Sequence, residues 1–209
     1  MAVVYILNAN NLSTDLSLYD NIDKLRLEKI KKSSNVLFKK EQLGSSLLLN
    51  DILENYFFMD ITKVEYIYNE YGKPYIKDSN LYFSLSHSNG VIALAVSKEE
   101  IGIDIELIKD VKDNLALKVM NEAEYNIYKG LSKNDKISYF YEVWTSKEAY
   151  VKKLGTTLTL NPSNINIDTD VILKNINISD NQYMIALTDA TYITIDERYI
   201  PKELLERKK

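Results

Sequence analysis

The segment 81-LYFSLSHSNGVIALAVSKEEIGIDIE-106 decides the fold of this chain of 209 residues. Its apolar residues fill three short runs, 81–86, 91–97 and 101–106. Asn89-Gly90 separates the first two runs and is typical of the tight turns that join antiparallel strands. The segment therefore predicts three consecutive strands. It also carries the only histidine of the chain and an Asp-x-Glu pair.

Helical and extended patterns flank this segment on both sides. Apolar residues at helical spacing predict helices at 20–32, 38–58, 121–129 and 133–153. Short apolar or alternating runs predict further strands at 2–7, 64–68, 164–168, 171–178, 182–188 and 192–195. The chain is therefore predicted to be an α+β protein, with helices packed on small, mainly antiparallel sheets.

A faint repeat relates the two halves of the chain. Val91-Ile-Ala-Leu-Ala followed by Ile101-Gly-Ile-Asp resembles Met184-Ile-Ala-Leu-Thr followed by Tyr192-Ile-Thr-Ile. Chance is a fair explanation for so short a match. If the repeat records a duplication, the chain has two similar lobes, with a boundary near 98–100 and a cleft between them.

Composition excludes several functional classes. The formal charge of −4 argues against nonspecific nucleic-acid binding. No apolar run is long enough to span a membrane, and the first ten residues lack the pattern of a secretory signal. The absence of cysteine excludes disulfides, thiolate metal ligands and a cysteine nucleophile. We therefore expect a cytoplasmic protein.

Basic residues crowd one N-terminal region with few acids among them. They are Lys24, Arg26, Lys29, Lys31, Lys32, Lys39 and Lys40. A solvated helix face explains such a cluster, and so does a local site for an anion such as a phosphorylated small molecule.

Asp104 and Glu106 alternate with isoleucines, so on a strand both carboxylates point to one face. Two carboxylates about 7 Å apart along a strand, with Gly102 beside them, can hold a hard divalent cation such as Mg²⁺. Acids on the wet face of a half-exposed strand would give the same pattern.

A second polar group falls on a predicted helix. Trp144 and Glu148 lie near one face, and Glu148 and Lys152 form an i,i+4 pair. The pattern fits a core tryptophan beside a surface Glu–Lys pair. It also fits a third carboxylate, with Lys147 or Lys152 as phosphate ligands.

Ser86-His87-Ser88 forms the third polar group. Adjacent residues on a strand face opposite ways, so a serine nucleophile next to its histidine base is not expected here. Hydroxyl and imidazole donors beside a turn suit an anion, and a structural histidine is the alternative.

Four motifs, taken in order, resemble the signature of the Sfp-type 4'-phosphopantetheinyl transferases. They are Gly72-Lys73-Pro74, Phe83 to Ser88, Gly102 to Glu106, and Trp144 to Lys152. The resemblance covers about residues 42–155. Each motif alone is weak, but four in this order and with these separations are specific.

The resemblance implies an enzyme that transfers the 4'-phosphopantetheine arm of coenzyme A to a serine hydroxyl of an apo acyl or peptidyl carrier protein. The products are the holo carrier and adenosine 3',5'-bisphosphate. The resemblance also implies a monomer of two pseudo-twofold-related α+β lobes, 1–99 and 100–209, tightly associated around the active site. Coenzyme A and the carrier are the expected partners, and neither nucleic acid nor a membrane is.

The resemblance further assigns roles to residues. Asp104, Glu106 and Glu148 are expected to hold Mg²⁺. Glu148 is expected to take the serine proton, directly or through a metal-held water, and Lys152 to stabilise charge on the phosphates. Coenzyme A is expected to contact a wider set, Lys40, Lys73, Pro74, Ser86, His87, Ser88, Asp104, Lys147 and Lys152.

One departure and two alternatives accompany this assignment. The family often has a second glycine after the lysine at position 152, where this chain has only Gly155. A Mg²⁺-dependent hydrolase of nucleotide pyrophosphates would use the same acids and lysines. A non-catalytic module that binds coenzyme A or a carrier would not need all three acids and both lysines, so their presence argues against it.

Overall fold

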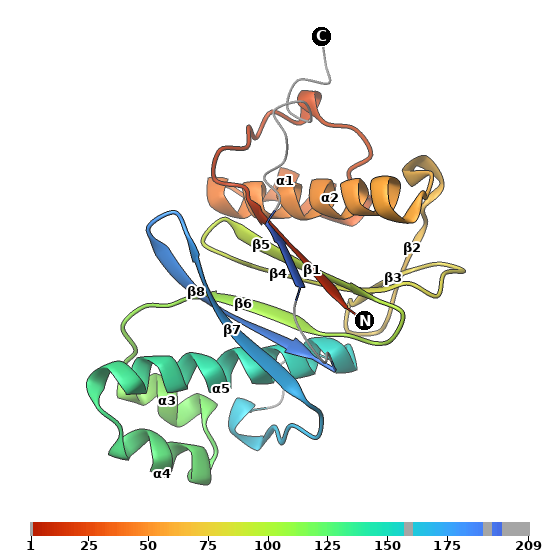
Figure 1. Cartoon of the computed structure of the whole chain (residues 1–209). Coiled ribbons are helices and arrows are strands. Elements are labelled where there is room, and N and C mark those ends of the chain that lie inside the picture. The colour runs from red at the N-terminus through yellow and green to blue at the C-terminus, as the bar shows by residue number, and fades with distance from the viewer. Residues whose placement is uncertain (1, 157–160, 190–193, 198–209) are drawn as a thin grey trace.

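The computed structural model describes residues 2–156, 161–189 and 194–197. Their elements form four layers: helices, a four-stranded sheet, a three-stranded sheet, and further helices (Figure 1). Each sheet is therefore covered by helices on its outer face and by the other sheet on its inner face.

The four-stranded sheet has the order β4-β5-β1-β9. Its strands are β1 (Val3–Asn8), β4 (Tyr82–Ser88), β5 (Val91–Ser97) and β9 (Thr194–Glu197). The hairpin of β4 and β5 turns at Asn89 and Gly90, whose φ angles of 51° and 81° suit a tight turn. β5 pairs antiparallel with β1, and β9 pairs with β1 in parallel. The hairpin predicted from the turn signal is confirmed.

Helices α1 (Lys24–Lys32) and α2 (Val36–Phe57) lie over the outer face of this sheet (Figure 1). The Asn35 side chain caps α2 by accepting a hydrogen bond from the Phe38 amide. A Cβ at Gly44 would come within 2.5 Å of Ile92 Cδ1, so glycine lets α2 approach the sheet closely. A separate ribbon pairs β2 (Tyr66–Tyr68) with β3 (Pro74–Ile76).

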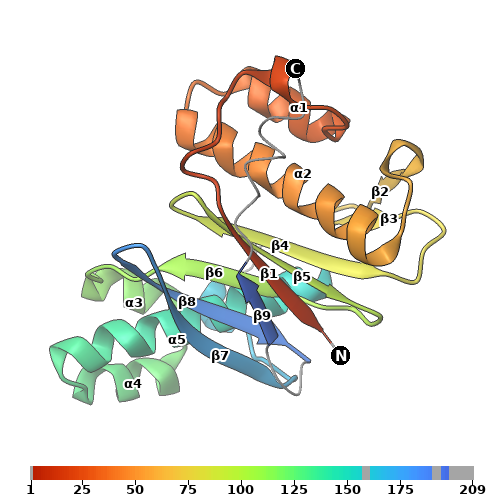
Figure 2. The same ribbon diagram turned by 45° about the horizontal axis from the view of Figure 1, so that its top comes forward.

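The three-stranded sheet has the order β6-β8-β7. Its strands are β6 (Ile103–Leu107), β7 (Val171–Ile178) and β8 (Asn181–Thr188), and its helices are α3 (Asp113–Val119), α4 (Glu122–Gly130) and α5 (Lys133–Leu154). Figure 2 shows α5 along this sheet. A Cβ at Gly102 would overlap the Ala149 carbonyl oxygen of α5, so glycine permits this contact. Short 3-10 turns are η1 (Leu16–Leu18), η2 (Ile61–Lys63) and η3 (Pro162–Asn164).

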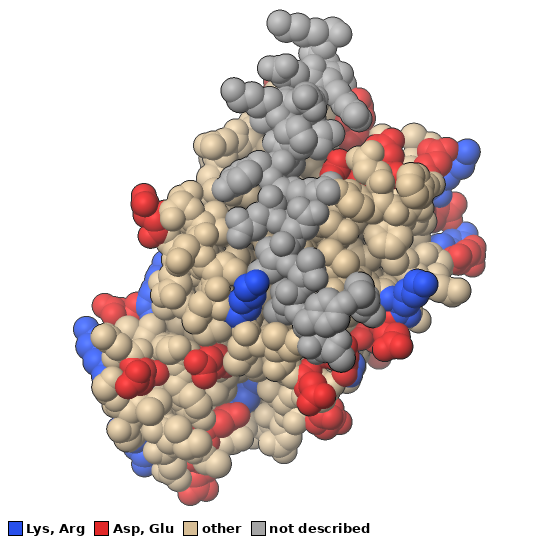
Figure 3. Space-filling view, in the orientation of Figure 1, with Lys and Arg blue, Asp and Glu red and all other residues tan. Residues whose placement is uncertain are grey.

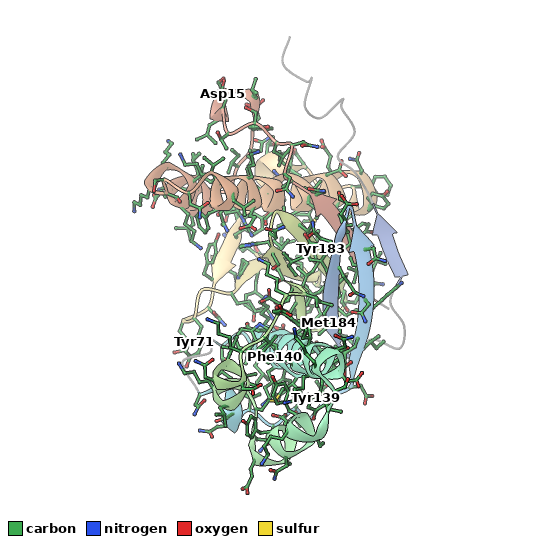
Figure 4. All side chains as sticks on the ribbon, turned by 90° about the vertical axis from the view of Figure 1, so that its left-hand side faces the viewer. Asp15, Tyr71, Tyr139, Phe140, Tyr183 and Met184 are labelled. Atoms are coloured by element: carbon green, nitrogen blue, oxygen red, sulfur yellow. The ribbon has the colours of Figure 1, made fainter. Side chains whose placement is uncertain are left out.

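One of the two large apolar clusters joins the two sheets. Side chains from β1, β5, β6, β7 and β8 pack there, while separate clusters fill the space under α2 and among α3, α4 and α5. Tyr183 and Met184, neighbours on β8, are both buried: Tyr183 belongs to the inter-sheet core, and Met184 lies toward α5 (Figure 4). Because successive side chains of a strand point to opposite faces, β8 packs against the other sheet on one face and against α5 on the other.

The α+β class and the small antiparallel sheets are confirmed. Residues 165–168 do not form the strand predicted there. The sequence does not predict α3, because Leu115 and Leu117 are exposed and do not mark a single apolar helix face. The strand predicted at 192–195 lies partly outside the described residues, and its last two positions begin β9.

The described part of the chain contains no helix of the length and apolarity needed to cross a membrane. On the face shown in Figure 3, acidic and basic side chains are interspersed. This face therefore presents no broad field of one sign.

Candidate active site

Three serines at alternate positions on β4 face the neighbouring strand β6. Ser84 Oγ accepts a hydrogen bond from the Ile103 amide at 3.1 Å. Ser86 Oγ donates to Asp104 Oδ1 at 2.7 Å. Ser88 Oγ donates to Glu106 Oε2 at 2.9 Å and accepts from the Leu107 amide at 3.1 Å. Serine side chains therefore join the edges of the two sheets and hold the two acids of β6.

Asp104 is buried and is held mainly through one of its two oxygens. Oδ1 accepts hydrogen bonds from Ser86 and, at 2.6 Å, from Lys152 Nζ of α5. Lys152 Nζ also donates to Ser86 Oγ at 2.8 Å. Oδ2 is buried and has no hydrogen-bond partner within the described residues. One oxygen of a buried carboxylate is thus left for a further ligand.

Glu106 is oriented by two donors. Trp144 Nε1 donates to Oε1 at 3.0 Å, and Ser88 donates to Oε2. Burial raises the pKa of Glu106, the nearby Asp104 raises it further, and the two hydrogen bonds only partly oppose these effects. Trp144, from the motif on α5, thus positions Glu106, from the motif on β6. The tryptophan side chain is itself partly buried against the apolar cluster of α3, α4 and α5.

Glu148, one turn before Lys152 on α5, completes the acidic group. Burial is the main cause that raises its pKa to about 7, and the charges of Asp104 and Glu106 add to the shift while Lys152 opposes it. Three carboxylates therefore lie close enough to repel one another when ionised. A cation bound among them would relieve that repulsion.

The donor set fits Mg²⁺, which prefers carboxylate oxygens, and the buried Oδ2 of Asp104 offers one such ligand. In residues 2–156, 161–189 and 194–197, no three His, Cys, Asp or Glu side chains already surround a metal position. The Lys152 ammonium instead neutralises Asp104. The three acids thus come from β6 and α5, and the positive charge beside them is supplied by the Lys152 ammonium.

A cavity of about 440 Å³ opens beside this group, between the α1–α2 region, the β2–β3 ribbon and β4. Lys152 lines it, and so connects it to the acids. Its other cationic lining residues are Arg26, Lys29 and Lys73, and its aromatic ones are Tyr66, Tyr68, Tyr71 and Phe83. Figure 4 places Tyr71 at the edge of the molecule. A basic and partly aromatic cavity suits an anionic ligand that carries a flat ring system.

Lys73 and Pro74 both line this cavity. The Lys73 ammonium donates to Glu100 Oε2 at 2.6 Å and to the Lys153 carbonyl at 2.9 Å. Asn69 Nδ2 donates to the Gly155 carbonyl at 2.6 Å. These bonds attach the β2–β3 turn to the end of α5, so the ribbon and α5 together shape one side of the cavity.

His87 faces away from Ser86 and Ser88, as alternation along β4 requires. Its Nδ1 lies 3.1 Å from Glu41 Oε2, and its Nε2 lies 3.2 Å from Gln42 Nε2, both on α2. His87 and Gln42 line the cavity. The Ser-His-Ser motif therefore serves two places, with serines at the acids and histidine at the cavity.

Two predicted ligands lie elsewhere. Lys147 is fully buried and binds Glu124 Oε2 at 2.6 Å and the Val119 carbonyl at 2.9 Å, so its assignment as a phosphate ligand is corrected to a structural one. Residues 147 and 148 point about 100° apart on a helix, which is why both cannot face the site. Lys40 binds the Asn10 carbonyl at 2.6 Å and is outside the cavity lining.

The sequence analysis gave no individual role to three residues at the site: Arg26, Lys29 and Glu41. Arg26 and Lys29 belong to the basic cluster, and their i,i+3 spacing is the signal that both face one side of α1. Glu41 lies in a polar run, and only the fold reveals that it is buried beside the histidine.

Comparison with known proteins adds an independent finding. Residues 100–194 match the family model of the 4'-phosphopantetheinyl transferase superfamily. The chain is 31% identical over 138 residues to 4'-phosphopantetheinyl transferase gsp of Aneurinibacillus migulanus, a match covering 66% of this chain and 58% of that protein. It is 30% identical over 119 residues to 4'-phosphopantetheinyl transferase Sfp of Bacillus subtilis (strain 168), covering 56% and 53%.

A third relative is 4'-phosphopantetheinyl transferase HetI of Nostoc sp. (strain PCC 7120 / SAG 25.82 / UTEX 2576), 35% identical over 115 residues, covering 52% of this chain and 48% of that protein. The chain spans about half the length of the curated relatives it matches. The family model covers β6 and α5, which carry the acids and Lys152. The resemblance predicted from the four motifs is thereby confirmed: the chain is similar to members of the 4'-phosphopantetheinyl transferase superfamily.

Proposed function

We propose that this protein transfers the 4'-phosphopantetheine arm of coenzyme A to a serine hydroxyl of an apo acyl or peptidyl carrier protein. In this reaction the serine Oγ forms a bond to the phosphorus of the arm. The bond between that phosphorus and the bridging oxygen breaks, and adenosine 3',5'-bisphosphate leaves. The serine gives up its proton to a base of the protein.

The observation that carries the proposal is the position of Lys152. Its ammonium contacts Asp104 and Ser86 and also lines the cavity, so acids and cavity form one continuous site. Phosphoryl transfer depends on positioning and on charge neutralisation between a nucleotide and its acceptor. A basic cavity that ends at three carboxylates supplies both.

Asp104, Glu106 and Glu148 would hold Mg²⁺. The ion, when bound, would neutralise charge on the pyrophosphate and on the leaving group. Ser88 and Trp144 would keep Glu106 in its orientation, and Ser86 would do the same for Asp104. Lys152 would turn from Asp104 toward a phosphate oxygen and stabilise the charge that develops there.

Glu148 is the proposed general base. Its place beside Asp104 and Glu106 supports this role, and in the metal-free site burial and the charges of those two acids raise its pKa to about 7. Because Glu148 lies next to the other two acids, it would accept the proton of the carrier's serine hydroxyl close to the reacting phosphorus. Its proton would then pass to solvent when the holo carrier leaves.

The nucleotide part of coenzyme A is proposed to occupy the cavity. Lys73, Pro74 and His87 would contact it, as expected from the motifs, together with Arg26 and Lys29. Their positive charges match the phosphates of coenzyme A. Lys147 is not part of this proposal, because its ammonium is buried against Glu124.

We also propose that residues 1–99 and 100–209 form two related lobes of a cytoplasmic monomer. Both sheets share one strand order, in which the first strand pairs with the second strand of a later hairpin: β1 with β5, and β6 with β8. β9 pairs with β1 and so returns the end of the second lobe to the first sheet.

A mass-shift assay tests the proposed activity. The protein is mixed with coenzyme A, Mg²⁺ and each of several apo carriers, and intact-mass spectrometry records whether a carrier gains the phosphopantetheine arm. We expect the gain with at least one carrier and its loss when Mg²⁺ is chelated. Absence of the gain with every carrier would refute the proposal, and consumption of coenzyme A without a carrier would indicate a pyrophosphate hydrolase instead.

A further inference from the structure

Glu41 is an acid that the proposed reaction does not use, and it is nearly fully buried at 7% exposure. It lies in the second turn of α2, next to the cavity-lining Gln42. Acids are rarely buried unless they are paired, because loss of water strongly disfavours the charged form. The burial of Glu41 therefore calls for specific partners.

Both carboxylate oxygens of Glu41 have such partners, and both partners lie on the β4–β5 hairpin. Oε1 accepts a hydrogen bond from the Gly90 amide at 2.9 Å. Oε2 lies 3.1 Å from His87 Nδ1. Burial acts to raise the pKa of Glu41, but the bonds from His87 and Gly90 outweigh it and hold the pKa below its usual value. Glu41 is therefore an ionised acceptor.

An ionised carboxylate can only accept, so His87 Nδ1 must carry the hydrogen. The tautomer of a neutral imidazole is set by the bond that one nitrogen makes, and here that bond leaves Nε2 without a hydrogen. This bare Nε2 lies 3.2 Å from Gln42 Nε2 and accepts a hydrogen bond from that amide, and both residues line the cavity. If the imidazole gains a proton, that proton is carried on Nε2.

We propose that Glu41 is a positioning residue, which fixes His87 with Nδ1 protonated and Nε2 directed at a phosphate group of the ligand in the cavity. Nε2 becomes a donor to the phosphate when the imidazole takes up a proton, and the direction of Nε2 is set before the ligand arrives, because Gly90 also holds the carboxylate in place. The ligand class is a phosphorylated nucleotide, so this part of the inference rests on the proposed function.

The first experiment tests the ligand-free protein. The chain has a single histidine, so ¹⁵N labelling of histidine gives one imidazole. At a pH where the ring is neutral, we expect a protonated Nδ1 and a bare Nε2 in the wild type. A bare Nδ1 would overturn the proposal, whatever the protein does with coenzyme A. In Glu41→Gln, the amide hydrogen can donate to Nδ1, and we expect the opposite tautomer.

The second experiment measures the Kd of coenzyme A by calorimetry in a double-mutant cycle. We expect Glu41→Gln to raise Kd about tenfold in the wild-type background, corresponding to about 1.4 kcal/mol, and less than about twofold in the His87→Ala background. Equal effects in both backgrounds would show that Glu41 acts on the fold alone, and would overturn the proposal. Glu54→Gln, at an exposed position of the same helix, is the matched control and should leave Kd unchanged.

These two experiments separate failure of the inference from failure of the proposed function. If coenzyme A does not bind the wild type, the proposed function fails and the phosphate part of the inference fails with it. The tautomer of His87 in the ligand-free protein still decides whether Glu41 fixes the protonation and orientation of the imidazole. A Glu41→Gln variant that does not fold leaves the wild-type spectrum as the deciding measurement.

Discussion

β1 and β6 have similar partners in the two sheets, but only β6 carries acids of the candidate site. Each is the first strand of its sheet in chain order and pairs antiparallel with the second strand of a later hairpin, β1 with β5 and β6 with β8. Each also turns one face of apolar residues into the inter-sheet core, Val4 and Ile6 on β1, Ile103 and Ile105 on β6. The other faces differ. β1 has Tyr5 and Leu7 there, under α2, whereas β6 has Asp104 and Glu106.

The difference follows from what lies beside each strand. β1 is enclosed by β5 and β9 within its sheet and covered by an apolar helix face, so a charged side chain would find no partner there. β6 is at the edge of its sheet, next to the serines of β4 and the Lys152 end of α5. A strand can carry buried acids where its neighbours offer donors and cations. Both strands thus have a structural role in the core, and the edge position of β6 also lets it carry the acids of the candidate site.

The largest expected effect concerns the acid face of β6. Asp104→Ala and Glu148→Gln should each lower the rate of carrier modification by at least about a thousandfold, because several kcal/mol of charge stabilisation depend on the three acids. The rates are measured by mass spectrometry, and circular dichroism verifies the fold. The exposed Glu54→Gln serves as control. Near wild-type turnover by either variant would mean that the reaction does not use this face.

Substitutions on the apolar faces of β1 and β6 should lower the free energy of unfolding by similar amounts, in contrast to substitutions on the acid face. Ile6→Ala on β1 and Ile105→Ala on β6 both remove fully packed side chains from the inter-sheet core. Each should lower the free energy of unfolding by about 2–5 kcal/mol in urea titrations. If one substitution lowered the free energy of unfolding by this amount and the other left it unchanged, the two strands would not have equivalent roles in the core.

Glu148 should make the stability of the metal-free protein depend on pH. Its pKa is about 7 in the folded protein and 4.5 at its reference value, so between these values the folded state binds more protons than the unfolded state. The contribution of this group therefore falls as pH rises from about 4.5 through 7. At pH 8 with a chelator, Glu148→Gln should melt above the wild type, by roughly 2–4 °C for each kcal/mol relieved.

That difference in melting temperature should vanish near pH 4.5, where the wild-type carboxyl is protonated, and Mg²⁺ should raise the wild-type value at pH 8. Melting curves that coincide at pH 8 would show that the three acids do not repel one another in solution.

The smallest expected effect concerns the serine contacts between the sheets. Ser88→Ala removes a bond to Glu106 and leaves the Leu107 amide without its acceptor. It should lower the free energy of unfolding by about 1–3 kcal/mol and raise the Mg²⁺ concentration needed for half-maximal rate. Ser84→Ala removes only the bond to the Ile103 amide, so it should cost stability with little change in Mg²⁺ dependence. Identical Mg²⁺ dependence in the two variants would contradict a role of Ser88 at Glu106.

Local patterns predicted much of the fold. The Asn89-Gly90 turn and the flanking apolar runs specify the β4–β5 hairpin, because turn geometry sets strand register. Alternation along β6 predicted that Asp104 and Glu106 share a face. By contrast, α3 is short and exposes leucines, so its sequence has no clear helical stripe.

The site was less predictable, since its members come from elements far apart in the chain. Lys147 and Lys152 are both lysines near Glu148, and only the orientation of α5 separates a buried structural ammonium from one at the acids. The spacing of Arg26 and Lys29 places both on one side of α1, but only the fold shows that this side, among seven basic residues of the region, faces the cavity.

The sequence by itself determined the secondary structure of the central segment, the shared face of the two acids on β6, and the resemblance to the family. These depend on periodicity, turn chemistry and motif order, which are local properties of the chain. Only the tertiary structure decided that Lys152 neutralises Asp104, that Ser88 and Trp144 orient Glu106, and that Glu41 lies against His87. Such contacts depend on which side chains become buried together, and burial sets their charge and hydrogen bonding.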